Sequence, residues 1–138
     1  MLERIRRDRG SGSDFLDFKT GFGGIIEAEF LVQALQMREN IWEPNWERAV
    51  DLLQERGRLT GSEAAKLRDA YGFLRRCESL LRRYDNKTVS AFSGDPNEQR
   101  KLAIRLGYEE FDAFRERYVN ARESIHTLYN SRIKNASG

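Results

Sequence analysis

The last third of the chain carries side chains at alternating steps of three and four residues. They are Phe111, Phe114, Tyr118, Ala121, Ile125, Leu128 and Arg132. An α-helix turns once every 3.6 residues, so this spacing places all of them along one stripe. Such a stripe is typical of a helix that packs along the seam of a bundle. The pattern therefore predicts a helix over 111–133 and an all-α fold.

Two helices are predicted ahead of the middle of the chain. The first spans 25–38 and ends near Asn40 and Pro44, and the second spans 45–55 and ends at Gly57. Because apolar residues recur at helical spacing in the first of these, we expect a broad stripe to face the core. Its members are Ile25, Ile26, Phe30, Leu31, Ala34 and Leu35.

Two more helices are predicted between these and the last one. A long helix follows N-cap candidates at 60–63 and closes at 86–87. A shorter one has Asp95 as its cap and Pro96 in its first position, where proline is tolerated, and it stops at Gly107. The inward positions of the long helix are Leu67, Ala70 or Tyr71, Leu74, Cys77, Leu81 and Tyr84. The sequence thus predicts an antiparallel up-and-down bundle of four to five helices.

The remaining segments set the limits of a single domain. Residues 1–14 are polar and contain a Gly-Ser tract, so we expect a flexible flank there. Residues 15–19 form a short extended segment, and residues 134–138 form a frayed tail. The bundle domain therefore spans 15–133, and residues 88–95 form a loop within it.

Composition excludes several classes of protein. The chain has 24 basic and 22 acidic residues, so it lacks the basic excess that a general nucleic-acid binder needs. One cysteine, Cys77, allows no internal disulfide, and with one histidine, His126, it cannot build a zinc site. No apolar run approaches the roughly 20 residues that span a bilayer. We expect a cytoplasmic protein with no membrane or nucleic-acid partner.

Three glycines, Gly21, Gly23 and Gly24, stand just before the first helix. Glycine-rich turns at helix N-termini can cradle phosphates with their free amides. This run lacks the Lys-Ser/Thr ending of a P-loop and the third glycine of the dinucleotide fingerprint. Spacing favours a structural turn over a phosphate site, although the free amides leave the second interpretation open.

Glu27 and Glu29 follow in the first helix, about 200° apart around its axis. They cannot chelate one ion together, and at least one must point toward the apolar side of the helix or its margin. We favour a carboxylate that pairs with an arginine of a facing helix, with Arg75 and Arg76 as candidate donors or simply surface cations. The alternative is a carboxylate that faces a neighbouring catalytic domain.

Other reactive or aromatic residues have simpler interpretations. Cys77 lies on an inward stripe and is expected to be a small core residue. His126 neighbours Ile125 on the last helix and is the one histidine of the chain, so a solvated or core-edge position is expected. Trp42 and Trp46 flank Pro44 and could form a hydrophobic clasp between helices or part of a partner surface.

A second acidic motif, Gly12-Ser13-Asp14-Phe15-Leu16-Asp17, is close to the Gly-Ser-Asp-x-Asp signature of nucleotidyltransferases. In that signature, two carboxylates two residues apart on a strand point to one face and hold metal ions. Here Asp14 and Asp17 are three residues apart, and a strand would point them to opposite faces. The sequence therefore predicts no metal site and no catalytic residue.

Several ordered blocks resemble motifs of the bacterial glutamine-synthetase adenylyltransferases. The blocks are Asp17-Phe18-Lys19, Gly23-Gly24-Ile25, Glu29-Phe30-Leu31-Val32-Gln33, Tyr71-Gly72-Phe73-Leu74-Arg75-Arg76-Cys77-Glu78, Asp95-Pro96 and Leu102–Tyr108. They occur in the family's order and cover roughly residues 15–133. Glu27 and Ala28 depart from the family's pattern in the first helix, as does Arg82 in the long one.

The resemblance implies one helical bundle of a large bifunctional enzyme. Each half of such an enzyme has a nucleotidyltransferase domain followed by a bundle. One half attaches AMP from ATP to a tyrosine of glutamine synthetase, and the other removes it by phosphorolysis under control of PII proteins. The implied partners are the adjacent catalytic domain, glutamine synthetase and PII protein, with ATP and Mg²⁺ used by the parent enzyme.

On this resemblance the chain does not catalyse adenylyl transfer alone, because it lacks the catalytic domain. Lys19, the turn at Gly21–Gly24, Glu27 and Glu29 are then expected at the seam between the two domains. Two alternatives stay open: a stand-alone, non-enzymatic helical interaction module, and a small nucleotide-binding bundle.

Overall fold

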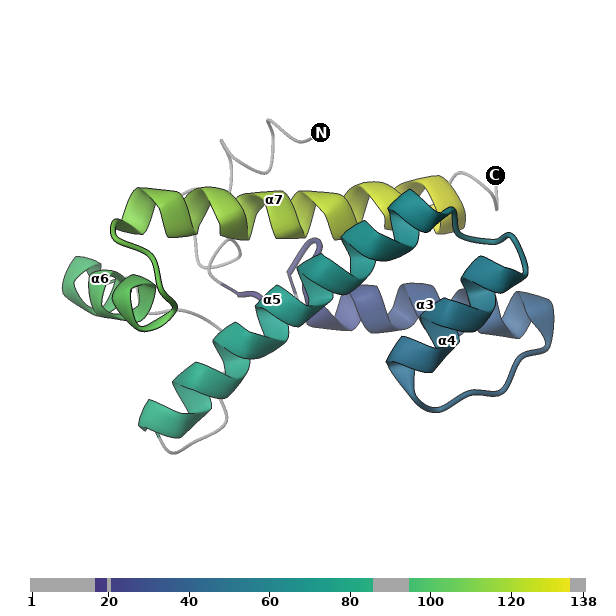
Figure 1. Cartoon of the computed structure of the whole chain (residues 1–138), viewed down its shortest axis with the longest axis horizontal. Helices are drawn as coiled ribbons and strands as arrows, with labels where there is room; N and C mark the ends of the chain where they lie inside the picture. Colours follow the sequence, from purple (N-terminus) through teal and green to yellow (C-terminus); the bar gives the residue numbers. More distant parts are fainter. Residues whose placement is uncertain (1–16, 20, 86–94, 135–138) are drawn as a thin grey trace.

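The computed structural model describes residues 17–19, 21–85 and 95–134, and most of these residues are helical (Figure 1). Its elements are α3 (Ile25–Glu39), α4 (Trp46–Glu55), α5 (Gly61–Asp85), α6 (Pro96–Arg105), α7 (Phe111–Tyr129) and a π-helical turn, η1 (Asn130–Lys134). No β-strand occurs in these ranges, so the all-α prediction is confirmed. The predicted flank, the 88–94 part of the predicted loop and most of the tail lie outside the described residues.

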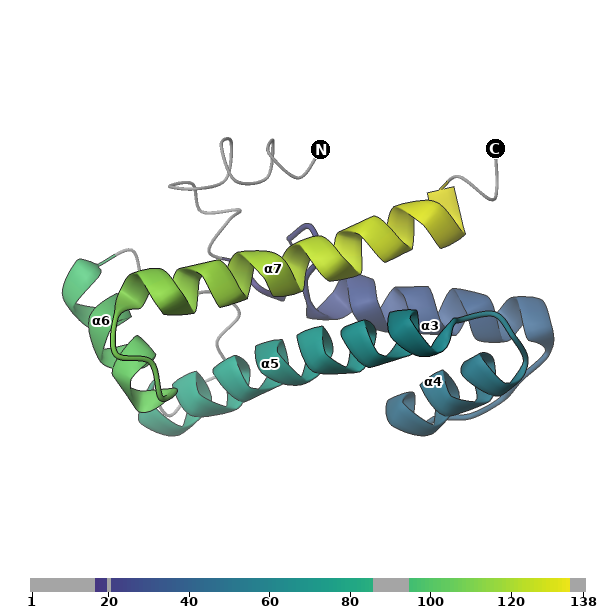
Figure 2. The same ribbon diagram turned by 45° about the horizontal axis from the view of Figure 1, so that its top comes forward.

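Three long helices form the body of the bundle. α5 runs in the opposite direction to both α3 and α7, and each of the three packs against the other two (Figures 1 and 2). α4 covers α3 and α5 at one end, and α6 packs against α7 at the other. None of the helices in the described ranges is long and apolar enough to cross a membrane.

The core contains the stripe that the sequence predicts on α7. Its buried members are Phe114, Tyr118, Ala121, Ile125 and Leu128. Four predicted positions of α5 are buried opposite them: Leu67, Ala70, Leu74 and Cys77. Each large side chain removed from water contributes about 1.5–3 kcal/mol to folding. Packing of α5 against α7 is therefore the centre of the domain.

Local sequence signals set the helix starts as predicted. Asn45 Oδ1 accepts a hydrogen bond from the Arg48 amide at 3.0 Å, and Asp95 accepts one from the Asn97 amide at 3.1 Å. Each bond satisfies an amide that has no partner within its own helix. Asn40 ends α3 in the left-handed conformation, with φ of 56°, and so turns the chain toward α4.

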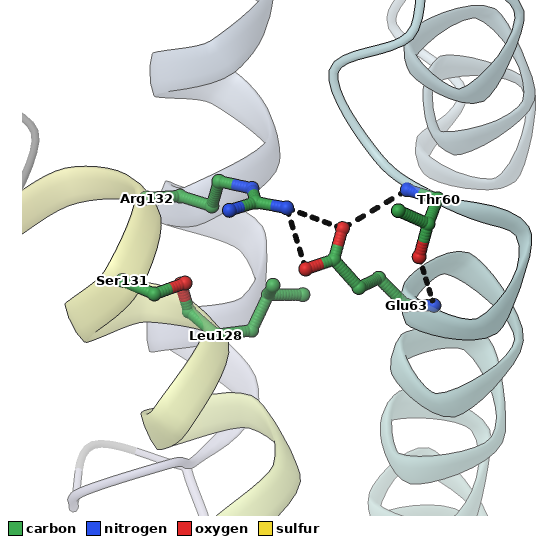
Figure 3. Close-up of polar contacts among 5 residues, drawn as sticks. All are labelled: Thr60, Glu63, Leu128, Ser131 and Arg132. Carbon is green, nitrogen blue, oxygen red and sulfur yellow. Dashed lines mark hydrogen bonds and ion pairs between the residues drawn. The ribbon is translucent and has the colours of Figure 1, made fainter.

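The start of α5 is bound to the end of the chain's last helical segment (Figure 3). Thr60 and Glu63 bond each other's amides at 3.0 and 2.9 Å, the reciprocal arrangement of a capping box. Arg132 Nη2 lies 2.5 Å from both carboxylate oxygens of Glu63. Burial opposes ionisation, but the hydrogen bonds from Thr60 and Arg132 outweigh it and lower the pKa of Glu63.

The broad stripe predicted for α3 is wrong at two positions. Ile26 and Phe30 are 44% and 52% exposed, whereas Ile25, Leu31 and Leu35 are buried. α3 carries apolar side chains on opposite sides, so periodicity alone could not separate the core side from the outer side. The exposed side of α3 forms part of the candidate site described below.

Candidate functional site

The glycine turn ahead of α3 is pressed against α7. Gly23 has φ of +67°, and a Cβ built on it would lie 1.9 Å from the backbone oxygen of Arg122. A Cβ on Gly24 would lie 2.7 Å from the backbone oxygen of Phe18. Only glycine allows backbone segments to approach so closely, and at Gly23 it also permits the positive φ. The turn is thus shaped by packing.

The amides at the start of α3 are engaged by the turn itself. Ile25 and Ile26 donate to the backbone oxygens of Phe18 and Lys19, each at 2.9 Å. The Gly23 amide donates to Glu27 Oε2. A phosphate needs such amides free and pointing outward, so this geometry favours the structural interpretation of the three glycines.

Glu27 also contacts α7, where it meets a buried histidine. Its Oε1 lies 3.0 Å from His126 Nδ1, and His126 Nε2 lies 3.3 Å from Asn130 Nδ2. Phe22 packs edge-on against the imidazole, with ring centroids 4.8 Å apart. Glu27 lies 99 positions from His126 in the chain, so the sequence around the histidine did not predict this pairing. His126 is 4% exposed.

Glu29 points instead toward α5. Tyr71 Oη donates a hydrogen bond to Glu29 Oε2 at 2.8 Å. Burial first, and then the Glu29 carboxylate, raise the pKa of Tyr71. Trp46 stacks on the Tyr71 ring at 3.9 Å, and its Nε1 donates to the Ala28 oxygen at 3.3 Å. Of the two tryptophans proposed as a clasp, Trp46 packs between helices and Trp42 is 92% exposed.

Arg75 and Arg76 were candidates either for partners of the two glutamates or for surface cations, and the structure favours the second alternative. Among the described residues, Arg75 pairs with Glu78, Nη1 to Oε1 at 2.9 Å, and Arg76 is exposed. The two carboxylates are bonded instead by side chains of the facing helices, Glu29 by Tyr71 of α5 and Glu27 by His126 of α7. The glutamates are therefore held by two different helices.

A buried carboxylate, Glu78, links the turn to α5. Its side chain is 3% exposed, with Lys19 Nζ 3.8 Å and Arg82 Nη2 3.4 Å from Oε2, besides Arg75. Three cations around one carboxylate offset the cost of burying it. Sequence reasoning did not single out Glu78, although its neighbour Cys77 is on the inward stripe and arginines stand three residues before and four after it.

Arg122 was also missed, and it is 1% exposed. Its Nε donates to the Phe22 backbone oxygen at 2.7 Å, and its Nη1 donates to Tyr118 Oη at 2.8 Å. Burial raises the pKa of Tyr118. A tyrosine and an arginine four residues apart on one helix, at the edge of the apolar stripe, were the available signal. Arg122 holds the turn on α7.

Exposed apolar side chains lie along the first half of α3. Ile26 and Phe30 are 44% and 52% exposed and lie four residues apart on α3, which places them on one side of the helix. Phe22, 43% exposed, lies in the turn just before the helix. We call these three residues the α3 outer face. Phe30 lies 6.3 Å from the Tyr129 ring, between centroids, at the border with α7. Large apolar patches on a surface mark contact sites.

The described ranges contain no group of three or more His, Cys, Asp or Glu side chains that could hold a metal ion. The polar residues at the turn are engaged with one another across α3, α5 and α7. The exposed apolar side chains of the α3 outer face lie beside them.

A family model described as GlnD PII-uridylyltransferase matches residues 1–133. The chain belongs to this family. The resemblance to the glutamine-synthetase adenylyltransferases is also confirmed. Proteins named bifunctional glutamine synthetase adenylyltransferase/adenylyl-removing enzyme are 31% identical over 82% of the chain in Stenotrophomonas maltophilia (strain K279a) and 33% identical over 94% in Methylococcus capsulatus. The chain spans 13–14% of the length of these relatives.

Three of the blocks that carry the family resemblance meet in the structure. The block from Glu29 contacts the block from Tyr71 through the carboxylate–phenol hydrogen bond, and Lys19 contacts Glu78. In this member of the GlnD PII-uridylyltransferase family, the turn and the long helix α5 are therefore one packed unit.

Proposed function

We propose that the chain is the helical domain of a glutamine-synthetase adenylyltransferase and seats the nucleotidyltransferase domain of that enzyme on the α3 outer face. The observation that carries the proposal is the exposure of Ile26 and Phe30 on α3, whose other side is core, and of Phe22 in the turn just before it. A helix that is apolar on both sides is typical of a protein interior. An adjacent domain would complete that burial.

The relatives support this arrangement. They are named for the addition and removal of the adenylyl group of glutamine synthetase, and they are several times longer than this chain. In the proposed role, the turn from Lys19 to Gly24 enters the helical domain at the seam, and Glu27 and Glu29 fix the angle of α3. Domains that contact each other in one chain commonly bury such moderately apolar surfaces.

The chemistry belongs to the adjacent domain in this proposal. ATP and Mg²⁺ would be bound there, since the described residues of this chain offer no cluster of metal ligands. The helical domain would support one wall of the cleft in which a tyrosine of glutamine synthetase gains or loses AMP. PII protein would regulate the whole enzyme. The enzyme would act in the cytoplasm.

A chimera tests the proposal. The matching segment of the Methylococcus capsulatus relative is replaced by this chain, and AMP transfer to and removal from glutamine synthetase are measured. We expect an active chimera, and a loss of about tenfold or more when Ile26→Lys and Phe30→Lys place charge in the seam. Ile104→Lys is the matched control, because Ile104 is 61% exposed on α6.

Two results would contradict the proposal. One is an inactive chimera whose helical content, measured by circular dichroism, is intact. The other is full activity of the Ile26→Lys and Phe30→Lys chimera, which would show that nothing essential packs on the α3 outer face.

A further inference from the structure

A cavity of about 550 Å³ lies between the second half of α3 and the segment that connects α3 to α4. Its walls include Glu29, Met37, Trp42, Glu43 and Trp46. This volume is within the range of pockets that bind a ligand or a few side chains. The α3 outer face lies nearer the start of α3 and contributes none of the cavity's residues.

The walls of the cavity are fixed before anything binds. Gln36 Nε2 donates to the backbone oxygen of Glu43 at 2.9 Å, which holds the connecting segment against α3. The Glu43 carboxylate accepts from the Asn45 amide at 2.9 Å. Trp46 is clamped between the Ala28 oxygen and the Tyr71 ring. A preformed pocket binds more tightly because little conformational freedom is lost on binding.

Two large apolar side chains stand at the mouth of this fixed pocket. Trp42 is 92% exposed and Met37 is 79% exposed. Trp and Met are enriched in protein–protein interfaces, and tryptophan is among the residues that carry most of the binding energy there. Their exposure beside a cavity, rather than on a flat surface, indicates a site that receives a side chain from a partner.

The cavity is lined by acidic side chains, which favours a partner with a positive charge. Glu29 and Glu43 line it, and no lysine or arginine does. Within the part of the chain that the structure describes, neither carboxylate has a salt bridge. Two unneutralised carboxylates repel phosphates and nucleic acid and attract a cation.

We infer that this cavity docks a segment of a separate protein that inserts an apolar side chain beside Trp42 and Met37 and sets a lysine or arginine against Glu43. The site takes its partner in trans, whereas the α3 outer face is assigned to a domain of the same enzyme. The inference goes beyond the proposed function and stands if that function fails, since it uses none of the residues of the α3 outer face.

Peptide selection on the purified chain tests the inference. A phage library of random 12-residue peptides is selected on the chain and counter-selected on the Trp42→Ala variant. We expect enriched peptides to share an aromatic or aliphatic residue within four positions of a lysine or arginine. Enrichment of acidic sequences, or equal recovery on both proteins, would overturn the inference.

The affinity of the enriched peptide is then measured by fluorescence anisotropy. We expect about tenfold weaker binding to Trp42→Ala and to the charge reversal Glu43→Lys. Ile104→Ala is the control and should bind as the original chain does, because Ile104 is 61% exposed on α6 and does not line the cavity. Circular dichroism of both variants should show the helical content of the original chain. Unchanged affinity in Glu43→Lys would overturn the assignment of the cation.

The occupant could instead be a second copy of this chain, or a nucleic acid. Light scattering that finds a dimer in the original chain and a monomer in Trp42→Ala would replace the inferred partner by a second copy. Binding of a labelled single-stranded oligonucleotide that is lost in Trp42→Ala would also overturn it. Neither result bears on the chimera, so the two proposals are tested separately.

Discussion

Glu27 of α3 and His126 of α7 are 99 positions apart in the sequence, and their Oε1 and Nδ1 atoms lie 3.0 Å apart in the structure. The side chains are 15% and 5% exposed. A second oxygen of Glu27 accepts from the Gly23 amide. One carboxylate thus joins the glycine turn to the last helix, and this arrangement gives the first prediction.

We expect Glu27 and His126 to be energetically coupled. In a double-mutant cycle of Glu27→Ala and His126→Ala, measured by urea unfolding, the coupling should be about 1–3 kcal/mol, because the hydrogen bond is largely shielded from water. Glu47→Ala is the control for loss of an exposed glutamate near a helix start. Additive losses in the cycle would show that the pair contributes no interaction of its own.

The Gly23 turn should not tolerate a side chain. Gly23→Ala brings a Cβ into the backbone of Arg122 and places alanine at positive φ, so we expect a loss of about 2 kcal/mol or more in the free energy of unfolding. Gly57→Ala is matched to it, because Gly57 has φ of +77° and open space around it. That variant should lose only about 1 kcal/mol. Equal losses of unfolding free energy in the two variants would mean that the turn moves away from α7 without destabilising the fold.

The Glu63–Arg132 bridge should make stability depend on pH in acid. The pKa of Glu63 is lowered below its ordinary 4.5 in the folded state. A lowered pKa contributes stability above the unfolded value and loses it as the pH falls through the folded value. The urea midpoint of the original chain should therefore fall more steeply between pH 5 and about 3 than that of Glu63→Gln. Parallel curves would contradict this.

Cys77 should be unreactive while the domain is folded. It is fully buried on α5, and burial raises the pKa of its thiol to about 12. Only the thiolate reacts readily with disulfide reagents, so labelling by DTNB at pH 8 should be slow in buffer and immediate in concentrated urea. Fast labelling in buffer would show that α5 opens locally near Cys77.

Helix positions were predictable because they depend on local spacing and end signals. The start of α6 is specified by Asp95 and Pro96, and the start of α4 by Asn45. The apolar stripe of α7 likewise specifies a helix through the spacing of neighbouring residues. The outer side of α3 was not predictable in this way. Ile25 and Ile26 look alike in the sequence. Ile25 is buried and Ile26 is exposed because the neighbouring helices pack against only one side of α3.

The partners of the polar residues were harder still to predict. Glu29 bonds Tyr71 and Glu27 bonds His126 because α5 and α7 bring those donors across from distant parts of the chain. From charge alone, arginine was the expected partner of these glutamates. Buried Glu78 and Arg122 were missed for the same reason, since a charged residue reads as solvent-exposed until its surroundings are known.

The contact between the glycine turn and α7 has a consequence for synthesis of the protein. Phe22, whose oxygen receives the Arg122 guanidinium, is 100 positions from that arginine. A growing chain therefore presents α3 to the cell long before the helix that secures its entrance has left the ribosome. Until then both apolar sides of α3 are open to chaperones and proteases. A nascent chain that ends before α7 should therefore be bound by chaperones or degraded by proteases.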